Sequence, residues 1–246
     1  MTQATSPPRQ ASHRATTVLG WATLVCLGAT YGLGLSLPAS VEQKDYSKLI
    51  GIHPGLAWAS YVAVGVSALG AIAWFVRRDR RWDRLNAASI EVGVVFTALT
   101  LVTGSLWGRP VWGVWWQWDP RLTTEALLMA LLLGFVALRR AIVEPGVRAV
   151  VSSAFSLLLV PLLVVIHFSV EWWRSLHQNG SLVSLDPGTN LDAGYLVAMV
   201  LGFASFTLAY AWLTVHRVRL EALEETLEET SLDTAIAARR AEAVTA

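Results

Sequence analysis

The 246-residue chain is strongly apolar: 54% of its residues are hydrophobic, 15% are charged, and its mean hydropathy is +0.49. A soluble domain carries about 25% charged residues, so this composition excludes an ordinary water-soluble globule and predicts an integral membrane protein. The single cysteine excludes an intrachain disulfide, a CxxC redox pair and a thiolate metal site. The net charge of +1 gives no reason to expect a nucleic-acid partner.

Six apolar segments are long enough to cross a bilayer. A helix needs roughly 20 apolar residues to span a hydrocarbon core about 30 Å thick, and lipid offers the backbone no hydrogen-bond partners. The predicted spans are 18–37, 54–76, 85–106, 122–138, 149–168 and 193–215. We therefore expect an all-α, polytopic membrane protein with six transmembrane helices, and we take the first segment as a retained helix rather than a cleaved signal.

The basic residues are unevenly distributed between the two sets of connections. Fourteen of the nineteen lie in the termini and the 77–84 and 139–148 connections, against Lys44, Lys48, Arg109, Arg121 and Arg174 in the other set. The positive-inside rule then places both termini in the cytoplasm and loops 38–53, 107–121 and 169–192 outside. This topology predicts a multi-pass membrane protein whose three outer loops lie on the side opposite the cytoplasm.

The chain divides into a six-helix transmembrane domain, residues 1–216, and an acidic tail, residues 217–246. Leu220, Leu223 and Leu227 recur at helical spacing among glutamates, which predicts an amphipathic helix continuing the sixth span into the cytoplasm. A solvated helix and a docking site for a cytoplasmic partner both remain open for this tail.

Tryptophan is concentrated in the outer loops, which hold seven of the twelve: Trp107, Trp112, Trp115, Trp116, Trp118, Trp172 and Trp173. Trp112, Trp115, Trp116 and Asp119 fall at i, i+3, i+4 and i+7 in a segment bounded by prolines. We therefore expect a short periplasmic surface helix with its indoles on one face. An aromatic belt would spread over both interfaces, so this one-sided cluster favours a platform for a flat ligand, with Gly108 allowing close approach.

Two histidines stand at the outer ends of predicted spans. His53 precedes a span that runs inward and His167 ends a span that runs outward, so both are expected at the same depth. Two imidazoles on separate helices can ligate a haem iron from opposite sides, whereas a lone membrane histidine is more often a hydrogen-bonded packing residue. His177 is either a third residue facing this site or a solvated one.

Charged residues near the tryptophans have two interpretations each. Arg109 and Arg121, with Arg174 as a further candidate, suit the propionates of a haem, because a guanidinium pairs bidentately with a carboxylate; each could equally be an interfacial anchor. Asp119 is expected to orient an indole or imidazole, or to pair with an arginine.

Two glutamates interrupt the predicted spans. Glu125 falls in the first turn of its span, with Thr123 as the expected cap, which favours a structural role. Glu91 is expected either to pair with a basic residue of the preceding connection or to face the bundle interior.

Two runs identify a family resemblance. TGSLWGRPVWGVWWQWDPRLTTE, residues 103–125, resembles the tryptophan-rich WWD signature of haem-handling proteins in cytochrome c maturation. VVIHFSVEWWRSLHQ, residues 164–178, resembles a motif of one six-helix branch, the haem exporter protein C (CcmC) family. The resemblance covers roughly residues 15–216. Around His53 the match is weaker, because Pro54 follows the histidine directly where the family usually has proline two positions on.

The resemblance implies a function and its site residues. The axial ligands fall on His53 and His167, and the platform on the tryptophans of residues 107–118, closed by Asp119. It implies non-covalent b-type haem, presented at the outer face to the membrane-anchored chaperone CcmE, with the ABC transporter subunits CcmA and CcmB and the small protein CcmD. No GxxxxGK[ST] loop is present, so ATP hydrolysis would belong to that transporter.

The expected role is ligation and presentation of haem rather than catalysis by side chains. Cys26 lies within the first predicted span, so we expect no cysteine nucleophile at the outer face. A membrane electron carrier would usually need a second histidine pair near the inner face, and a secondary transporter would be expected to show inverted repeats. Both remain as weaker alternatives.

Overall fold

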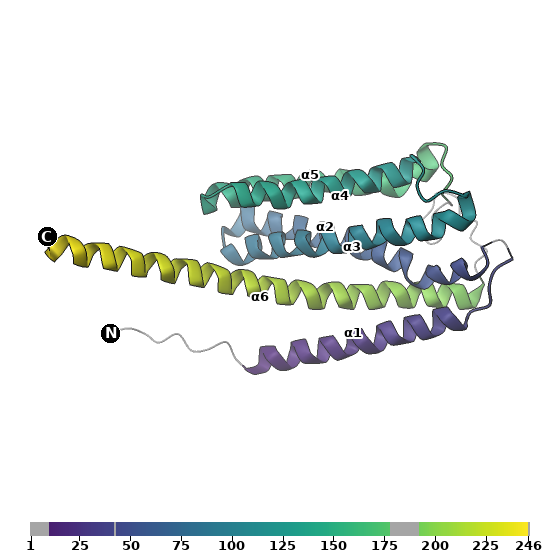
Figure 1. The fold of residues 1–246 in the computed structure, drawn as a ribbon, viewed down its shortest axis with the longest axis horizontal. Helices are drawn as coiled ribbons and strands as arrows, with labels where there is room; N and C mark the ends of the chain where they lie inside the picture. Colours follow the sequence, from purple (N-terminus) through teal and green to yellow (C-terminus); the bar gives the residue numbers. More distant parts are fainter. Residues whose placement is uncertain (1–9, 42, 178–191, 246) are drawn as a thin grey trace.

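The computed structural model describes residues 10–41, 43–177 and 192–245. This part of the chain forms six long helices (Figure 1) and one short 3₁₀ helix: α1 (Gln10–Ser36), η1 (Asp45–Gly51), α2 (His53–Arg77), α3 (Arg80–Trp112), α4 (Pro120–Ala141), α5 (Pro145–Trp172) and α6 (Ala193–Thr245). All six are long and apolar enough to cross a membrane. The all-α, six-span prediction is confirmed.

The helices run back and forth, so the start of α1 and the end of α6 lie at the same end of the bundle (Figure 1). At the opposite end lie η1, the starts of α2, α4 and α6, and the ends of α3 and α5. We call this the outer end, after the orientation expected from the basic residues; the cytoplasmic location of the termini stays a prediction. Much of the expected outer loop 169–192 lies outside the described residues.

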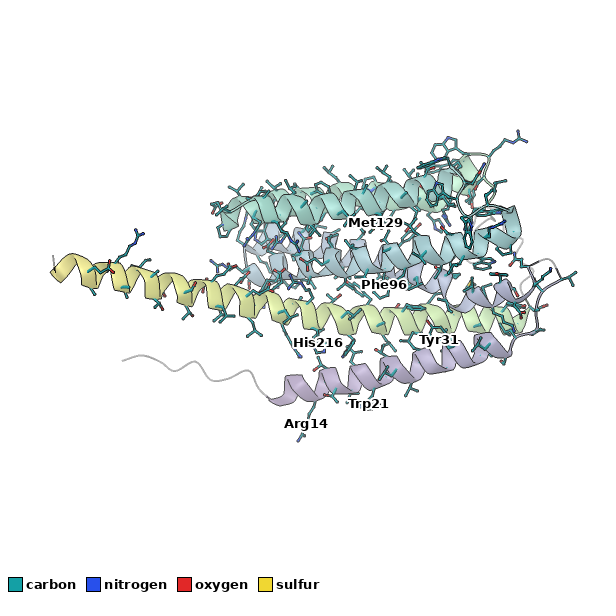
Figure 2. All side chains as sticks on the ribbon, in the orientation of Figure 1. Arg14, Trp21, Tyr31, Phe96, Met129 and His216 are labelled. Atoms are coloured by element: carbon teal, nitrogen blue, oxygen red, sulfur yellow. The ribbon has the colours of Figure 1, made fainter. Side chains whose placement is uncertain are left out.

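Helix α2 lies at the centre and packs against α3, α5 and α6, while α1 packs on α6 alone among the long helices. Phe96 of α3, which is labelled in Figure 2, contacts Phe206 and Tyr210 of α6 edge-on or tilted. Trp21, on the side of α1 away from α6, is exposed and suited to lipid. A second apolar cluster joins α2 and α3 to α4 and α5 around Phe135.

Buried hydrogen bonds fasten the helices where lipid would leave polar groups unsatisfied. Ser67 of α2 and Ser156 of α5 each donate to Asn86 Oδ1 of α3 at 2.6 Å. On the other side of α2, Ser89 Oγ of α3 lies 2.6 Å from the Tyr210 hydroxyl of α6. Three helix pairs are thus held by side-chain oxygens within the apolar core.

The inner end is held by ion pairs. Arg139 of α4 donates from both terminal nitrogens to Asp83 of α3 at 2.8 Å, and both side chains are about nine-tenths buried. Arg217 of α6 pairs with Glu91 of α3 and, at 3.1 Å, with Glu221. Glu91, for which two roles were open, therefore pairs with α6 and with no residue of the preceding connection. Arg139 and Arg217 therefore each join two helices at the inner end.

The acidic tail continues α6 without a break to Thr245, as the spacing of its leucines predicts. Glu225 lies 3.3 Å from Arg84 and Glu229 2.6 Å from Arg80, so the first turns of the tail lie against the start of α3. Leu220, Leu223 and Leu227 are exposed, which leaves the apolar side of the tail open.

The predicted surface helix between Pro110 and Pro120 is wrong. Helix α3 continues through Pro110 to Trp112, and Gly113, with a φ of 78°, ends it in the left-handed conformation that glycine adopts without strain. Residues 113–119 are not helical. Asp119, rather than Thr123, caps α4 by accepting from the Arg121 N–H at 3.0 Å. Trp112, Trp115, Trp116 and Asp119 therefore do not share one helix face.

Candidate functional site

A cavity of about 960 Å³ opens at the outer end of the bundle, between the outer parts of α2, α3 and α6 and near the start of α4 and the end of α5. Ligand pockets typically measure about 300–1,000 Å³ and are mostly apolar with a few polar groups, as this one is. Eight predicted site residues line it: His53, Trp107, Gly108, Trp112, Trp116, Arg121, His167 and His177.

His53 is the first residue of α2, and Pro54 behind it occupies a position where a missing N–H costs nothing. Its Nδ1 lies 3.0 Å from Thr103 Oγ1 of α3, and its ring meets Trp107 edge-on at 5.7 Å between centroids. A Cβ at Gly104 would lie 3.1 Å from His53 Cε1, so the glycine leaves the space that this imidazole occupies.

His167 lines the same cavity from near the end of α5. Arg121, in the first turn of α4, donates from one nitrogen to the backbone carbonyls of Ile166 at 2.6 Å and His167 at 3.1 Å. The His167 ring contacts Phe168 edge-on, and Phe168 in turn stacks on Trp172. Arg121 thus ties the start of α4 to the turn of α5 that carries the imidazole.

Three tryptophans contribute to the cavity wall in different ways. Trp112 lies over Gly108, where a Cβ would come within 2.8 Å of the indole, and its ring is 6.3 Å from that of His177. The indole N–H of Trp107 donates to Gln43 at 3.1 Å. The indole N–H of Trp116 is buried and has no hydrogen-bond partner among the described residues. That donor is available to a ligand.

The other six predicted site residues do not line the cavity: Arg109, Trp115, Trp118, Asp119, Trp172 and Trp173. The four indoles among them are at least half exposed, and Trp118 reaches 76%. Such a rim at the outer end matches the aromatic belt of a membrane protein better than the wall of a binding site. The tryptophan cluster therefore divides into a cavity wall and an exposed rim.

Arg109 and Asp119 have structural partners instead. Arg109 donates to the carbonyl of Gly113 and lies over the Trp115 ring, so it closes the end of α3. Asp119 is buried and, besides capping α4, accepts from Ser175 Oγ at 3.0 Å and from the Leu176 N–H at 2.7 Å. Asp119 thus joins the end of the tryptophan loop to the segment after α5 that carries His177.

Several lining residues escaped the sequence analysis. Helix α6 contributes a stripe at intervals of four, Met199, Phe203 and Thr207, and α2 contributes Trp58, whose indole N–H donates to Thr207 at 2.9 Å. The four-residue interval was present in the sequence. Which face of α6 lines a cavity, however, depends on how α6 packs against α2, and the sequence does not show that.

Glu125 also faces the cavity, which its predicted structural role did not anticipate. It lies in the second turn of α4 because the helix begins at Pro120, and its side chain is buried. Its Oε1 has no hydrogen-bond partner in the described part of the chain. An unsatisfied carboxyl oxygen in an apolar wall is costly, so this group is a candidate contact for a polar part of a ligand.

Comparisons with known proteins give a consistent result. The sequence matches the family described as "CcmC: Heme exporter protein C" over residues 2–233. It is 36% identical to the "Heme exporter protein C" of Haemophilus influenzae over 207 residues, covering 82% of each chain. It is 33% identical to that of Escherichia coli K12 over 201 residues, covering 80% of this chain and 78% of the relative. The chain belongs to the heme exporter protein C family.

Because the chain belongs to the heme exporter protein C family, haem is the ligand to compare with the residues that line the cavity. Among the described residues no three His, Cys, Asp or Glu side chains cluster as a bare metal ion would require. A haem iron, already held by four porphyrin nitrogens, needs only axial ligands, and two imidazoles line this cavity. Its mostly apolar wall suits the porphyrin, and Arg121 suits a propionate. The residues present fit haem.

Proposed function

We propose that this CcmC-family chain binds b-type haem non-covalently in the outer-end cavity, with His53 and His167 as the two axial ligands of the iron. The observation that carries the proposal is that both imidazoles, from different helices, line one apolar cavity. The bound haem is the cargo that the protein hands on during cytochrome c maturation.

Donor groups on one side of the cavity would set the orientation of the haem. Arg121 uses one terminal nitrogen on backbone carbonyls, and its guanidinium retains further donors. Trp116, whose buried indole N–H has no hydrogen-bond partner among the described residues, also lines the cavity. Two donors suit a propionate carboxylate, which fixes one edge of the porphyrin and directs the vinyl edge elsewhere.

The chain's own chemistry is ligation, orientation and exclusion of water rather than bond-making. Its only cysteine, Cys26, lies in α1 and does not line the cavity. Any covalent attachment of the haem would therefore depend on a nucleophile of the receiving protein. In this proposal the chain is a presenting protein, and the acceptor is the membrane-anchored haem chaperone CcmE.

The proposed setting is the cytoplasmic membrane, with the outer end facing the periplasm. CcmA and CcmB would supply ATP-driven release, because this chain has no phosphate-binding loop, and CcmD would complete the complex. The exposed indoles at the outer end suit a surface that lies at headgroup depth and meets a membrane-anchored partner.

Haem loading of the chaperone tests this function. The chain would be expressed with tagged CcmE, CcmA, CcmB and CcmD in cells lacking their own system, and haem on the purified chaperone would be measured. We expect loading with the wild-type chain and with the control His216→Ala, and at least tenfold less with His167→Ala. Equal loading with His167→Ala, or none with the wild type in haem-replete cells, would contradict the proposal.

A further inference from the structure

The threonine beside His53 has a hydroxyl whose proton can be assigned. Thr103 lies in the outer part of α3, and its Oγ1 is 2.8 Å from the Leu99 carbonyl and 3.2 Å from the Thr100 carbonyl. Carbonyl oxygens only accept hydrogen bonds, and a threonine hydroxyl has one proton. The proton of Thr103 is therefore directed to the backbone of its own helix.

The third neighbour of that hydroxyl is His53 Nδ1, at 3.0 Å. With the hydroxyl proton directed to that backbone, Thr103 Oγ1 offers this nitrogen a lone pair, and in this arrangement Nδ1 carries the hydrogen and donates it. A neutral imidazole protonated at Nδ1 has a bare lone pair at Nε2. That nitrogen is then the one able to bind a metal.

We propose that Thr103 is a positioning residue that holds His53 in the Nδ1–H tautomer, so that Nε2 presents its lone pair to the haem iron. This inference rests on the proposed function and adds a residue to it. Metal-binding histidines commonly donate their other ring N–H to an acceptor that fixes the ring and raises its basicity. Here a threonine hydroxyl, polarised by its bond to the Leu99 carbonyl, supplies that acceptor.

Two neighbouring residues set the position of the His53 ring but not its tautomer. Gly104, the next residue, leaves room for the imidazole, and Trp107 meets it edge-on, so ring position is set by shape. Neither contact distinguishes the two ring nitrogens. The Thr103 hydroxyl is the side-chain partner of the His53 ring among the described residues, and the ring also hydrogen-bonds the Thr100 backbone, whose carbonyl can only accept; together they favour a ring N–H on this side.

The test is a hemin titration of the full-length protein, purified apo in detergent, followed by redox titration of the complex. Thr103→Val removes the hydroxyl and keeps the shape, while Thr103→Ser keeps the hydroxyl. Thr23→Val is the matched control, because Thr23 of α1 makes the same kind of bond, to the Leu19 carbonyl at 2.8 Å, and does not line the cavity. If Thr103→Val does not purify folded, Thr103→Ala replaces it.

We expect Thr103→Val to weaken hemin binding about 10–100-fold, the usual effect of removing such a partner. The midpoint potential should shift to more positive values, because a less basic imidazole stabilises ferric iron less. Thr103→Ser and Thr23→Val should stay close to the wild type in both measurements.

The outcomes separate this inference from the proposed function. If the wild type binds hemin with two axial histidines, and Thr103→Val matches Thr23→Val in affinity and potential, the role of Thr103 is refuted while the haem site stands. Tighter binding by Thr103→Val would indicate the opposite tautomer and also refute it. If the wild type develops no Soret band on titration with hemin, both proposals fail.

Discussion

His53 and His167 are held at the cavity by different means. The ring of His53 is wedged at a helix start among Thr103, Gly104 and Trp107 of α3, so its position depends on side-chain fit. His167 lies within α5, and its turn is fixed through the backbone by Arg121. A change in the side chains packed around His53 should therefore displace that imidazole, whereas His167 depends on a backbone contact.

Gly104→Ala tests that dependence. The new methyl group would lie 3.1 Å from His53 Cε1, tighter than ordinary contact, so the ring must move away from its position. We expect hemin affinity of the purified protein to fall about tenfold, as for other disturbances of ligand orientation, with thermal stability nearly unchanged.

The control for this variant is Gly65→Ala in α2, where a Cβ would meet no atom within 4 Å among the described residues. Gly65→Ala should bind hemin as the wild type does. If both variants bind hemin equally well, the fit of His53 against α3 does not control its ligation.

The residue types and their spacing were sufficient to predict that His53 and His167 lie at the same depth, because the apolar spans fix the depth of residues near their ends. They were insufficient for the tryptophans. Trp116 and Trp118 both lie in the same loop, yet only Trp116 lines the cavity while Trp118 is exposed. In a non-helical segment, side-chain direction follows from local turns and from contacts such as those of Asp119, which no periodic pattern encodes.

Among the elements, η1, α2 and α6 approach one another at glycines. A Cβ at Gly202 of α6 would overlap the carbonyl of Gly51 in η1, and one at Gly55 of α2 would lie 2.9 Å from the backbone of Gly202. This close approach places the start of α2, and with it His53, against α6. It also brings Met199 and Phe203 to the cavity wall.

Gly202→Ala should therefore destabilise the protein by forcing η1 and α6 apart. Overpacking of this kind costs about 1–3 kcal/mol. We expect a lower midpoint of heat denaturation for the detergent-solubilised protein. The midpoint is measured from the fraction of protein that stays monodisperse as the temperature rises. Gly28→Ala in α1, where a Cβ would meet no described atom within 4 Å, is the control. Equal midpoints for the two variants would show that this contact tolerates a methyl group.

Hydropathy predicted every long helix because each must bury its backbone polar groups in hydrocarbon. The exception was the expected surface helix, where four residues at helical spacing were mistaken for a separate element. Gly113 ends α3 in a left-handed conformation, and Asp119 starts α4 by capping it. The helix end at Gly113 and the helix cap at Asp119 thus leave residues 113–119 non-helical despite their helical spacing.

At the scale of the whole molecule, α6 contributes to both ends of the bundle. Its outer part lines the cavity, and its inner part pairs with α3 through Arg217–Glu91 and with α4 through Glu221, whose Oε2 is 3.8 Å from Arg139. The sequence offered no means of pairing Arg217 with Glu91, because the two are far apart along the chain and meet only after the helices pack.

A double-mutant cycle tests the inner-end clamp. Arg217→Gln leaves Glu91 without its principal partner in a partly buried place, which we expect to cost roughly 3 kcal/mol. The double variant Glu91→Gln/Arg217→Gln should cost less than the sum of the single variants. The measurement is chemical or thermal unfolding of the solubilised protein.

The exposed pair Arg80–Glu229 provides the comparison, since surface ion pairs contribute about 0–1 kcal/mol. Arg80→Gln should therefore change stability little. The stabilising role of the Arg217–Glu91 pair would be contradicted if the losses in unfolding free energy of the two single variants were strictly additive. A larger loss of stability from Arg80→Gln than from Arg217→Gln would also contradict it.

The most direct measurement of the central claim is the absorption spectrum of the protein purified from haem-replete cells, oxidised and reduced. We predict a Soret band with the six-coordinate, low-spin form of two axial imidazoles. His53→Ala and His167→Ala should each lose that form, whereas His216→Ala, whose ring packs on Trp212 away from the cavity, should keep it. A wild-type protein without a Soret band, or an unchanged spectrum in His53→Ala or His167→Ala, would contradict the account.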